Sequence, residues 1–124
     1  MIVVDTSVWI DHFDGNNAVL PDLLATEQVA MHPLILGELL LGGLPRRSQT
    51  IRDLRRLPAS PVASVDETLV FIEAQQLQQI GVGLVDANVV ASLLLDRSFR
   101  LLTRDKRLAM LAVRLGVNFE DAAH

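Results

Sequence analysis

Short apolar runs alternate with longer stretches of helical periodicity along the whole chain. The runs are rich in β-branched or aliphatic residues, which is typical of buried strands. They are Ile2–Val4, Gln28–Met31, Pro61–Ala63, Arg100–Leu102 and Val117–Phe119. Regular alternation of strand and helix predicts a parallel sheet that helices cover on both faces.

The expected helices begin and end at recognisable residues. Pro21 and Pro33 suit the first position of a helix, and Ser64 with Glu67 three residues later forms a capping box. Gly81 suits the residue that follows the end of a helix. The predicted helices cover about residues 7–13, 33–41, 64–80, 85–97 and 104–115, with two more after Pro21 and between Pro45 and Pro58, and a turn covers 14–17.

A sheet of this kind has few possible topologies, because crossovers between parallel strands are right-handed. We expect an α/β fold with a central parallel sheet of about five strands in the order 3-2-1-4-5, the first strand in the centre. The 124 residues, with a mass of 13.6 kDa, correspond to a single domain over residues 1–124, without a linker, repeat or low-complexity tract.

Composition narrows the chemistry that the domain can perform. There is no cysteine, which excludes disulfides, cysteine-based zinc sites and thiol nucleophiles. The net charge of −4 argues against a generally basic nucleic-acid coat, although a local basic patch stays possible. No run approaches the roughly 20 apolar residues of a membrane helix, and the first residues lack the features of a signal peptide. We therefore expect a cytoplasmic protein without a membrane partner.

Four acidic residues, far apart in the sequence, are candidates for a shared site. Catalytic groups of open parallel sheets gather at the carboxyl ends of the strands. Asp5 directly follows the first strand, and Asp105 lies just past the fourth, its expected neighbour. Glu38 lies in the helix after the second strand, and Asp86 lies in the first turn of the helix that leads into the fourth. All four can therefore converge on one edge of the sheet.

Glu38 and Asp86 stand among apolar residues, where a buried and unpaired carboxylate costs several kcal/mol. Either acid alone is explained by exposure to solvent or, for Asp86, by a preference for a helix N-terminus. Four acids together are better explained by a cation, because clustered carboxylates repel one another. An all-oxygen ligand set suits Mg²⁺ or Mn²⁺, and such a site can activate water for phosphodiester hydrolysis.

Four short segments reinforce this interpretation: Ile2–Asp11, the segment from His32-Pro33 to Leu39, Gly83–Ala87 and Leu101–Asp105. In this order they span essentially the whole chain, and they resemble the PIN-domain nucleases, most closely the VapC toxins of VapBC toxin–antitoxin pairs. The resemblance implies a three-layer α/β/α fold whose acidic site binds Mg²⁺ or Mn²⁺ and cuts cellular RNA of the tRNA or rRNA class. It also implies a homodimer and inhibition by a cognate VapB-like antitoxin.

The resemblance assigns roles to the acids at the matching positions. The catalytic quartet corresponds to Asp5, Glu38, Asp86 and Asp105. Asp5, Asp86 and Asp105 would be the leading metal ligands, and Glu38 would hold a second ion or orient a ligand or water.

Three polar residues stand within two positions of these acids in the sequence. Ser7 and Thr103 correspond to accompanying hydroxyls, although Ser and Thr also favour helix N-termini as caps. Asn88 stands where many close relatives have His, so no role is carried over to it.

Basic residues offer candidate contacts to RNA. Arg104, Lys106 and Arg107 flank Asp105 and would lie near a phosphate held at a metal ion, although Arg104 can instead pair with a carboxylate and orient it. A second group forms either an RNA-contacting face or a solvated helix face, and the sequence does not decide between these. It consists of Arg46, Arg47, Arg52, Arg55 and Arg56.

Other α/β enzymes with an Asp after the first strand lack their required partners here. Haloacid-dehalogenase-like phosphohydrolases need a second Asp two residues on, where this chain has Ser7, and receiver domains need an acidic pair that is absent. Two alternatives stay open: a PIN-like RNA-binding or interaction module without cleavage activity, and a PIN nuclease of RNA maturation. The presence of all four acids argues against the first, and the small size favours a toxin over the second.

Overall fold

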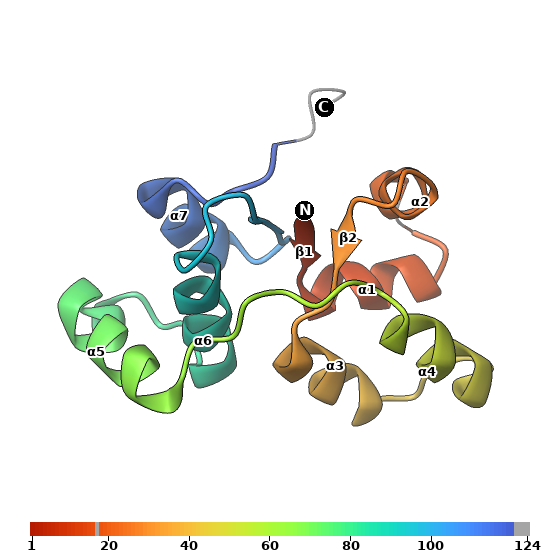
Figure 1. Ribbon diagram of the computed structural model, residues 1–124, viewed down its shortest axis with the longest axis horizontal. Helices are drawn as coiled ribbons and strands as arrows, with labels where there is room; N and C mark the ends of the chain where they lie inside the picture. Colours follow the sequence, from red (N-terminus) through yellow and green to blue (C-terminus); the bar gives the residue numbers. More distant parts are fainter. Residues whose placement is uncertain (17, 121–124) are drawn as a thin grey trace.

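Figure 1 presents the computed structural model of the chain, which describes residues 1–16 and 18–120. Residue 17, the last of the expected turn, and residues 121–124, the end of the expected domain, lie outside the described residues. The elements in chain order are β1 (Ile2–Val4), α1 (Thr6–Phe13), α2 (Val19–Ala25), β2 (Val29–Ala30), α3 (Pro33–Leu40), α4 (Arg47–Arg55), α5 (Val65–Gln75), the 3-10 helix η1 (Leu77–Gln79), α6 (Leu84–Leu93), β3 (Arg100–Leu102) and α7 (Lys106–Leu115).

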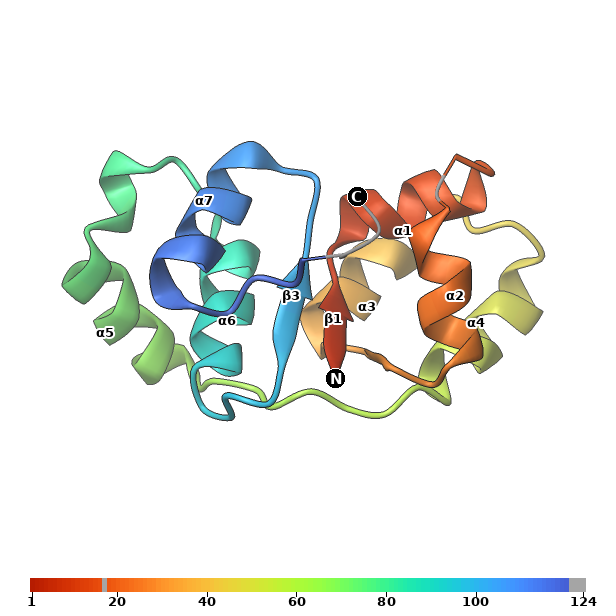
Figure 2. The same cartoon turned by 90° about the horizontal axis from the view of Figure 1, so that it is seen from above.

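The strand β1 lies at the centre of the sheet. It pairs in parallel with β2 on one side, where Ile2 lies opposite Val29, and with β3 on the other, where Ile2 lies opposite Arg100. Helices α5, α6 and α7 lie on one side of the strands and α1 to α4 on the other (Figures 1 and 2). The expected α/β class, the parallel sheet and the central first strand are thus confirmed.

The sheet has three strands within the described residues, so the expectation of about five strands was wrong. Beyond β2, Met31 forms a single parallel bridge with Ala59, and the expected strand Pro61–Ala63 does not form. Pro58 and Pro61 flank this bridge, and neither supplies the N–H group that a longer ladder needs. The third expected strand is therefore reduced to one pair of residues.

The chain also departs from the expected pattern at β3 and at α5. Leu101 forms one bridge, with Asn118, in place of the expected strand Val117–Phe119. The helix α5 ends at Gln75 because Gln76 adopts a left-handed conformation with a φ of 52°. The short helix η1 follows instead of a continuous helix to residue 80.

The helices α3 and α5 both begin at a residue whose side chain accepts a hydrogen bond from a backbone N–H group of the first turn. Ser64 Oγ accepts from the backbone N–H of Glu67 at 3.0 Å, and Glu67 Oε1 accepts from the N–H of Ser64 at 2.9 Å, which is the expected capping box of α5. Pro33 begins α3, and His32 Nδ1 accepts from the N–H of Leu34 at 3.1 Å. Each such cap stabilises a helix by about 1 kcal/mol.

The helix α6 is buried on every side along most of its length. Every residue from Ala87 to Leu93 is buried, including the polar residues Asn88 and Ser92. The orientation of such a helix about its own axis is fixed, because rotating it would leave its buried polar groups without partners.

No helix in the described part of the chain is long and apolar enough to cross a membrane.

Candidate functional site

Asp5 stands where β1 ends and α1 begins. Its backbone N–H donates to the carbonyl oxygen of Leu102 at 2.9 Å, which extends the pairing of β1 with β3 by one residue. Its carbonyl oxygen accepts from the N–H of Val8 at 3.0 Å and so starts α1. The side chain forms no cap to the helix and is only 8% exposed. The central strand therefore places this carboxylate at the carboxyl edge of the sheet.

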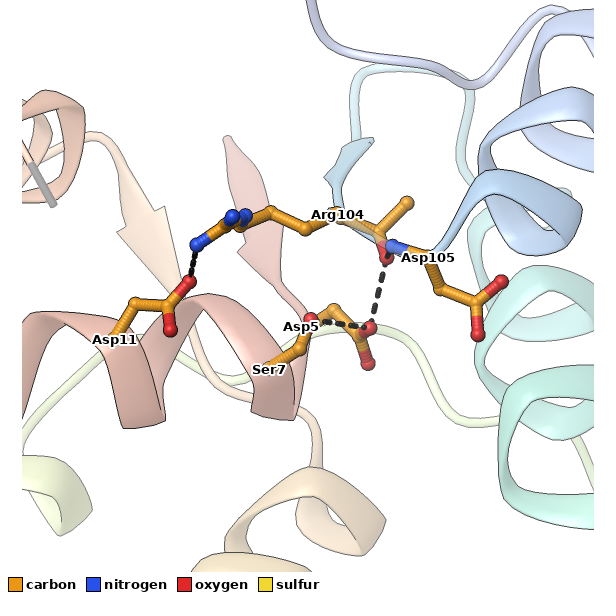
Figure 3. A network of polar contacts seen from close by, with 6 residues as sticks. Asp5, Ser7, Asp11, Arg104 and Asp105 are labelled. Carbon is orange, nitrogen blue, oxygen red and sulfur yellow. Dashed lines mark hydrogen bonds and ion pairs between the residues drawn. The ribbon is translucent and has the colours of Figure 1, made fainter. Parts of the chain in front are cut away.

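Two hydroxyl groups hold the carboxylate of Asp5. Thr103 Oγ1 donates to Asp5 Oδ2 at 2.8 Å, and Ser7 Oγ donates to the same oxygen at 3.2 Å (Figure 3). The structure thus brings together the acid and both hydroxyls that the sequence singles out. Within the described residues, Asp5 Oδ1 accepts no hydrogen bond, which leaves one carboxylate oxygen available to a ligand.

Glu38 reaches the same region from α3. Thr6, the residue after Asp5, donates from Oγ1 to Glu38 Oε1 at 2.8 Å. Glu38 is exposed, so its carboxylate lies at the edge of solvent rather than among its apolar sequence neighbours. Sequence reasoning missed Thr6, and its position directly after Asp5 is the signal that points to it.

Asp105 caps a helix as well as lying near the other acids. Its Oδ1 accepts from the backbone N–H of Arg107 at 2.9 Å and of Leu108 at 3.1 Å, which caps α7. Its own N–H donates at 3.1 Å to Thr103 Oγ1, the hydroxyl that also donates to Asp5. Figure 3 shows that the carboxylate of Asp105 points away from Asp5. Thr103 therefore links two acids whose carboxylates face different ways.

Asp86 joins the group from the first turn of α6. Its pKa is raised to about 6, first by burial and then by the negative charges of Asp5, Glu38 and Asp105. These neighbours are the other three acids predicted from the sequence. Four carboxylates from four separate segments therefore share one electrostatic environment at the carboxyl edge of the sheet.

The four acids do not form a closed metal site on their own. Across residues 1–16 and 18–120, no group of three or more His, Asp or Glu side chains is arranged so that it could hold an ion. The chemistry of the donors nevertheless fits Mg²⁺ or Mn²⁺, because all of them are carboxylates. A bound cation would also relieve the repulsion that raises the pKa of Asp86. The residues thus fit such an ion in donor type, and side-chain movement would complete its shell.

Asp86→Asn is expected to stabilise the metal-free protein at pH 7 by on the order of 1 kcal/mol. The carboxyl group has a pKa of about 6 in the folded protein and an ordinary value of 3.8, so the folded state binds more protons between these values. Stability from this group is therefore lost as the pH rises through that window. Urea unfolding in EDTA at pH 7 and pH 4.5 measures the effect, and an equal gain at both pH values would contradict it.

Asn88 turns into the core rather than toward the acids. Its Nδ2 donates to Ala63 O at 3.0 Å and to Thr68 Oγ1 at 2.8 Å, and its backbone carbonyl oxygen accepts from Ser92 Oγ at 2.6 Å. Ser92 Oγ lies 3.0 Å from Nε2 of His32, whose pKa burial lowers to about 4, so that the ring is neutral at pH 7. The network fastens α6 to its neighbours and so fixes the helix on which Asp86 stands.

The basic residues near Asp105 point in different directions. Arg104 extends from the end of β3 to α1, where it forms an ion pair with Asp11 (Figure 3). Arg107 packs against Gly81, where a Cβ atom would lie 2.9 Å from the guanidinium Nη1. Lys106 is exposed in the first turn of α7.

The arginines between Pro45 and Pro58 are all exposed, and two of them, Arg47 and Arg52, have hydrogen-bond partners among the described residues. Arg47 donates to the carbonyl oxygens of Leu40 at 2.7 Å and Gly42 at 3.0 Å, which closes the loop between α3 and α4. Arg52 donates to Gln49 Oε1 at 2.8 Å. These contacts favour a structural role for Arg47 and leave the outer face of α4 basic.

Comparison with known proteins agrees with the geometry of the site. Residues 2–114 match the family model of the PIN domain. Two proteins, each named Ribonuclease VapC32, come from Mycobacterium tuberculosis strains CDC 1551 / Oshkosh and ATCC 25618 / H37Rv. Each is 41% identical to this chain over 117 residues, which cover 94% of the chain and 94% of the relative.

Proposed function

This chain belongs to the PIN-domain family and is VapC-like, and from that premise we propose that it is a Mg²⁺- or Mn²⁺-dependent endoribonuclease toxin. The reaction is hydrolysis of a phosphodiester bond in cellular RNA. One observation carries the proposal: Asp86 lies close enough to Asp5, Glu38 and Asp105 that their negative charges add to burial, the larger cause, in raising its pKa, so four acids from distant segments meet at the carboxyl edge of the sheet.

The residues that would hold the ion are Asp5, Asp86 and Asp105, with Glu38 as a further ligand or as the residue that orients a ligand or water. When bound, Mg²⁺ or Mn²⁺ lowers the pKa of a coordinated water and stabilises the oxygens of an in-line phosphoryl displacement. The raised pKa of Asp86 supports this proposal, because carboxylates that repel one another in the free protein bind a dication favourably.

The neighbouring residues orient the acids. Ser7 and Thr103 both donate to Asp5 Oδ2, which turns the other oxygen of this carboxylate toward a ligand. Thr6 holds one oxygen of Glu38. These hydroxyls restrict the side-chain freedom that would otherwise be lost when the acids assemble around an ion and a substrate.

The proposed substrate is a tRNA- or rRNA-class molecule with a single-stranded segment that reaches the acids. Proteins recognise such segments through splayed bases and phosphates rather than through the deep groove of an RNA duplex. We propose that Arg104, Lys106 and Arg107 contact its phosphates, because they flank Asp105, the residue that caps α7. We also propose that the protein acts in the cytoplasm, where such RNA is available to it.

The proposed partner is a VapB-like antitoxin that blocks the acidic site. A cleft of about 310 Å³ supports this proposal, because it begins at Glu38 and is lined by the apolar residues Ile10, Phe13 and Leu39. Such a cleft suits a peptide that combines apolar and basic side chains. We also propose that two copies of the chain associate, since α5 exposes large apolar side chains such as Val65 and Val70.

Induced expression in cells, followed by mapping of the 5′ ends of total RNA, tests the proposal. The protein is expected to arrest growth and to create one or a few new RNA ends, and Asp5→Asn is expected to create none. If both proteins accumulate in folded form and neither changes growth nor RNA, the proposed function is wrong and a binding module becomes the better account. New ends confined to precursor RNA, without growth arrest, would favour a nuclease of RNA maturation.

A further inference from the structure

Three consecutive residues after β3 attach to three different partners. Thr103 donates to Asp5 at the end of β1, and Asp105 caps α7. Arg104, between them, extends in the opposite direction to Asp105 and meets Asp11 on α1 (Figure 3). The loop between β3 and α7 is therefore fastened to the end of β1 through Asp5 and to the last turn of α1 through Asp11. In the view of Figure 3 the Arg104 side chain passes above Asp5 and Ser7 on its way to Asp11.

Asp11 stands one helical turn after Ser7, so both residues lie on the face of α1 that is turned toward Arg104. Figure 3 shows Ser7 and Asp11 on this side of the helix, with Arg104 above them. The only cationic group that is paired with a carboxylate in the described residues thus borders the acidic cluster.

The ion pair is accessible to other anions. The side chain of Arg104 is 60% exposed and that of Asp11 is 25% exposed. An exposed pair of this kind contributes little to the stability of a protein. Asp11 meets the guanidinium through one contact, from Arg104 Nη1 to Asp11 Oδ2, whereas a phosphate group free to approach the same guanidinium can accept two parallel charge-assisted hydrogen bonds. A phosphodiester approaching the acids can therefore displace Asp11.

We propose that Asp11 is a placeholder for a substrate phosphate: it holds Arg104 extended across the site in the free protein and releases it to an RNA phosphate. This inference rests on the proposed function, because it assumes that RNA binds at the acids. It makes Arg104 a substrate-binding residue and Asp11 a residue that limits affinity for RNA. Asp11 does so by competing with the substrate for the same guanidinium group.

Binding measurements in the Asp5→Asn background test the proposal without cleavage. The probe is a fluorescein-labelled single-stranded oligoribonucleotide of mixed sequence, followed by anisotropy in Mg²⁺ buffer. Adding Arg104→Gln is expected to weaken binding about tenfold, which is the loss of one charge-assisted contact. The slope of log affinity against log salt is expected to fall by about 0.7. Adding Asp11→Asn instead is expected to tighten binding about threefold.

Two controls separate competition from a general change in charge. Asp14→Asn removes the same charge from an exposed position three residues further along, at the end of α1, and is expected to tighten binding less than Asp11→Asn. In the Arg104→Gln background, Asp11→Asn is expected to tighten binding no more than Asp14→Asn does. This non-additivity is what competition for one guanidinium requires.

The contrary outcomes are distinct. Weaker binding by Asp11→Asn would mean that the pair positions Arg104 for RNA, and equal effects of Asp11→Asn and Asp14→Asn would mean that only net charge matters. Each of these two results would overturn the proposal. It would also be overturned if Arg104→Gln left the affinity for RNA unchanged, or if the Asp5→Asn parent did not bind RNA at all. A parent that binds RNA while the wild-type protein cuts none would overturn the proposed function and leave the placeholder inference standing on the binding data.

Discussion

Asp5→Asn is expected to lower the rate of RNA cleavage by on the order of a thousandfold while the fold is retained. Asp5 lies at the end of the central strand, and its carboxylate has one oxygen held by two hydroxyls and the other without a partner in the described residues. The amide keeps the size of the side chain and an oxygen that can accept from Ser7 and Thr103. It removes the negative charge that a metal ligand at this position needs.

Initial cleavage rates with a labelled RNA, together with thermal unfolding, measure this prediction. Asp22→Asn serves as the matched control, because Asp22 is exposed on α2, away from the acids, and this variant is expected to keep full activity. The melting temperature of Asp5→Asn is expected to stay at or above that of the wild type, since removing one carboxylate reduces the repulsion at Asp86. A folded Asp5→Asn protein that cleaves at the normal rate would sink the assignment of the site.

Removal of divalent ions is expected to abolish cleavage completely, and Mg²⁺ or Mn²⁺ is expected to restore it. The proposed mechanism requires an ion that draws the four acids together, since they share one environment but form no closed ligand set among the described residues. Cleavage measured in excess EDTA and after readdition of each ion checks the expectation. Cleavage that persists after thorough chelation would rule out the proposed mechanism.

A second readout does not depend on activity. An ion that binds only the folded state raises its stability, so Mg²⁺ is expected to raise the melting temperature of the wild type at pH 7. The rise is expected to be much smaller in Asp86→Asn, which lacks one of the proposed ligands and has already lost the repulsion that the ion would relieve. The same rise in both proteins would place the ion elsewhere.

The sequence predicts the elements that depend on local chemistry. The buried run at residues 2–4, the proline at the start of α3 and the capping box of α5 all appear in the structure. Asp5, at the end of the first run, follows from the rule that parallel sheets present their carboxyl ends together. The local signals were sufficient there because no distant contact opposes them.

Other features depend on contacts that the sequence pattern does not contain. The left-handed conformation of Gln76 ends α5 at a residue that has no turn signature. Pro58 and Pro61 are visible in the sequence, but their effect on the third strand follows only from where the single bridge at Ala59 falls. The partners of Glu38 and Arg104 are Thr6 and Asp11, two ordinary helix residues whose roles arise from tertiary packing.

The pairing of β1 with β3 also has a consequence for the synthesis of the protein. Asp5 and Thr103, which share a hydrogen bond, are separated by 98 positions in the chain. A ribosome therefore releases Asp5 long before the hydroxyl that orients it and the acid that follows. A nascent chain that has not yet emerged as far as Asp105 cannot assemble the acidic cluster, so the site forms only after the segment from β3 to the start of α7 has left the ribosome.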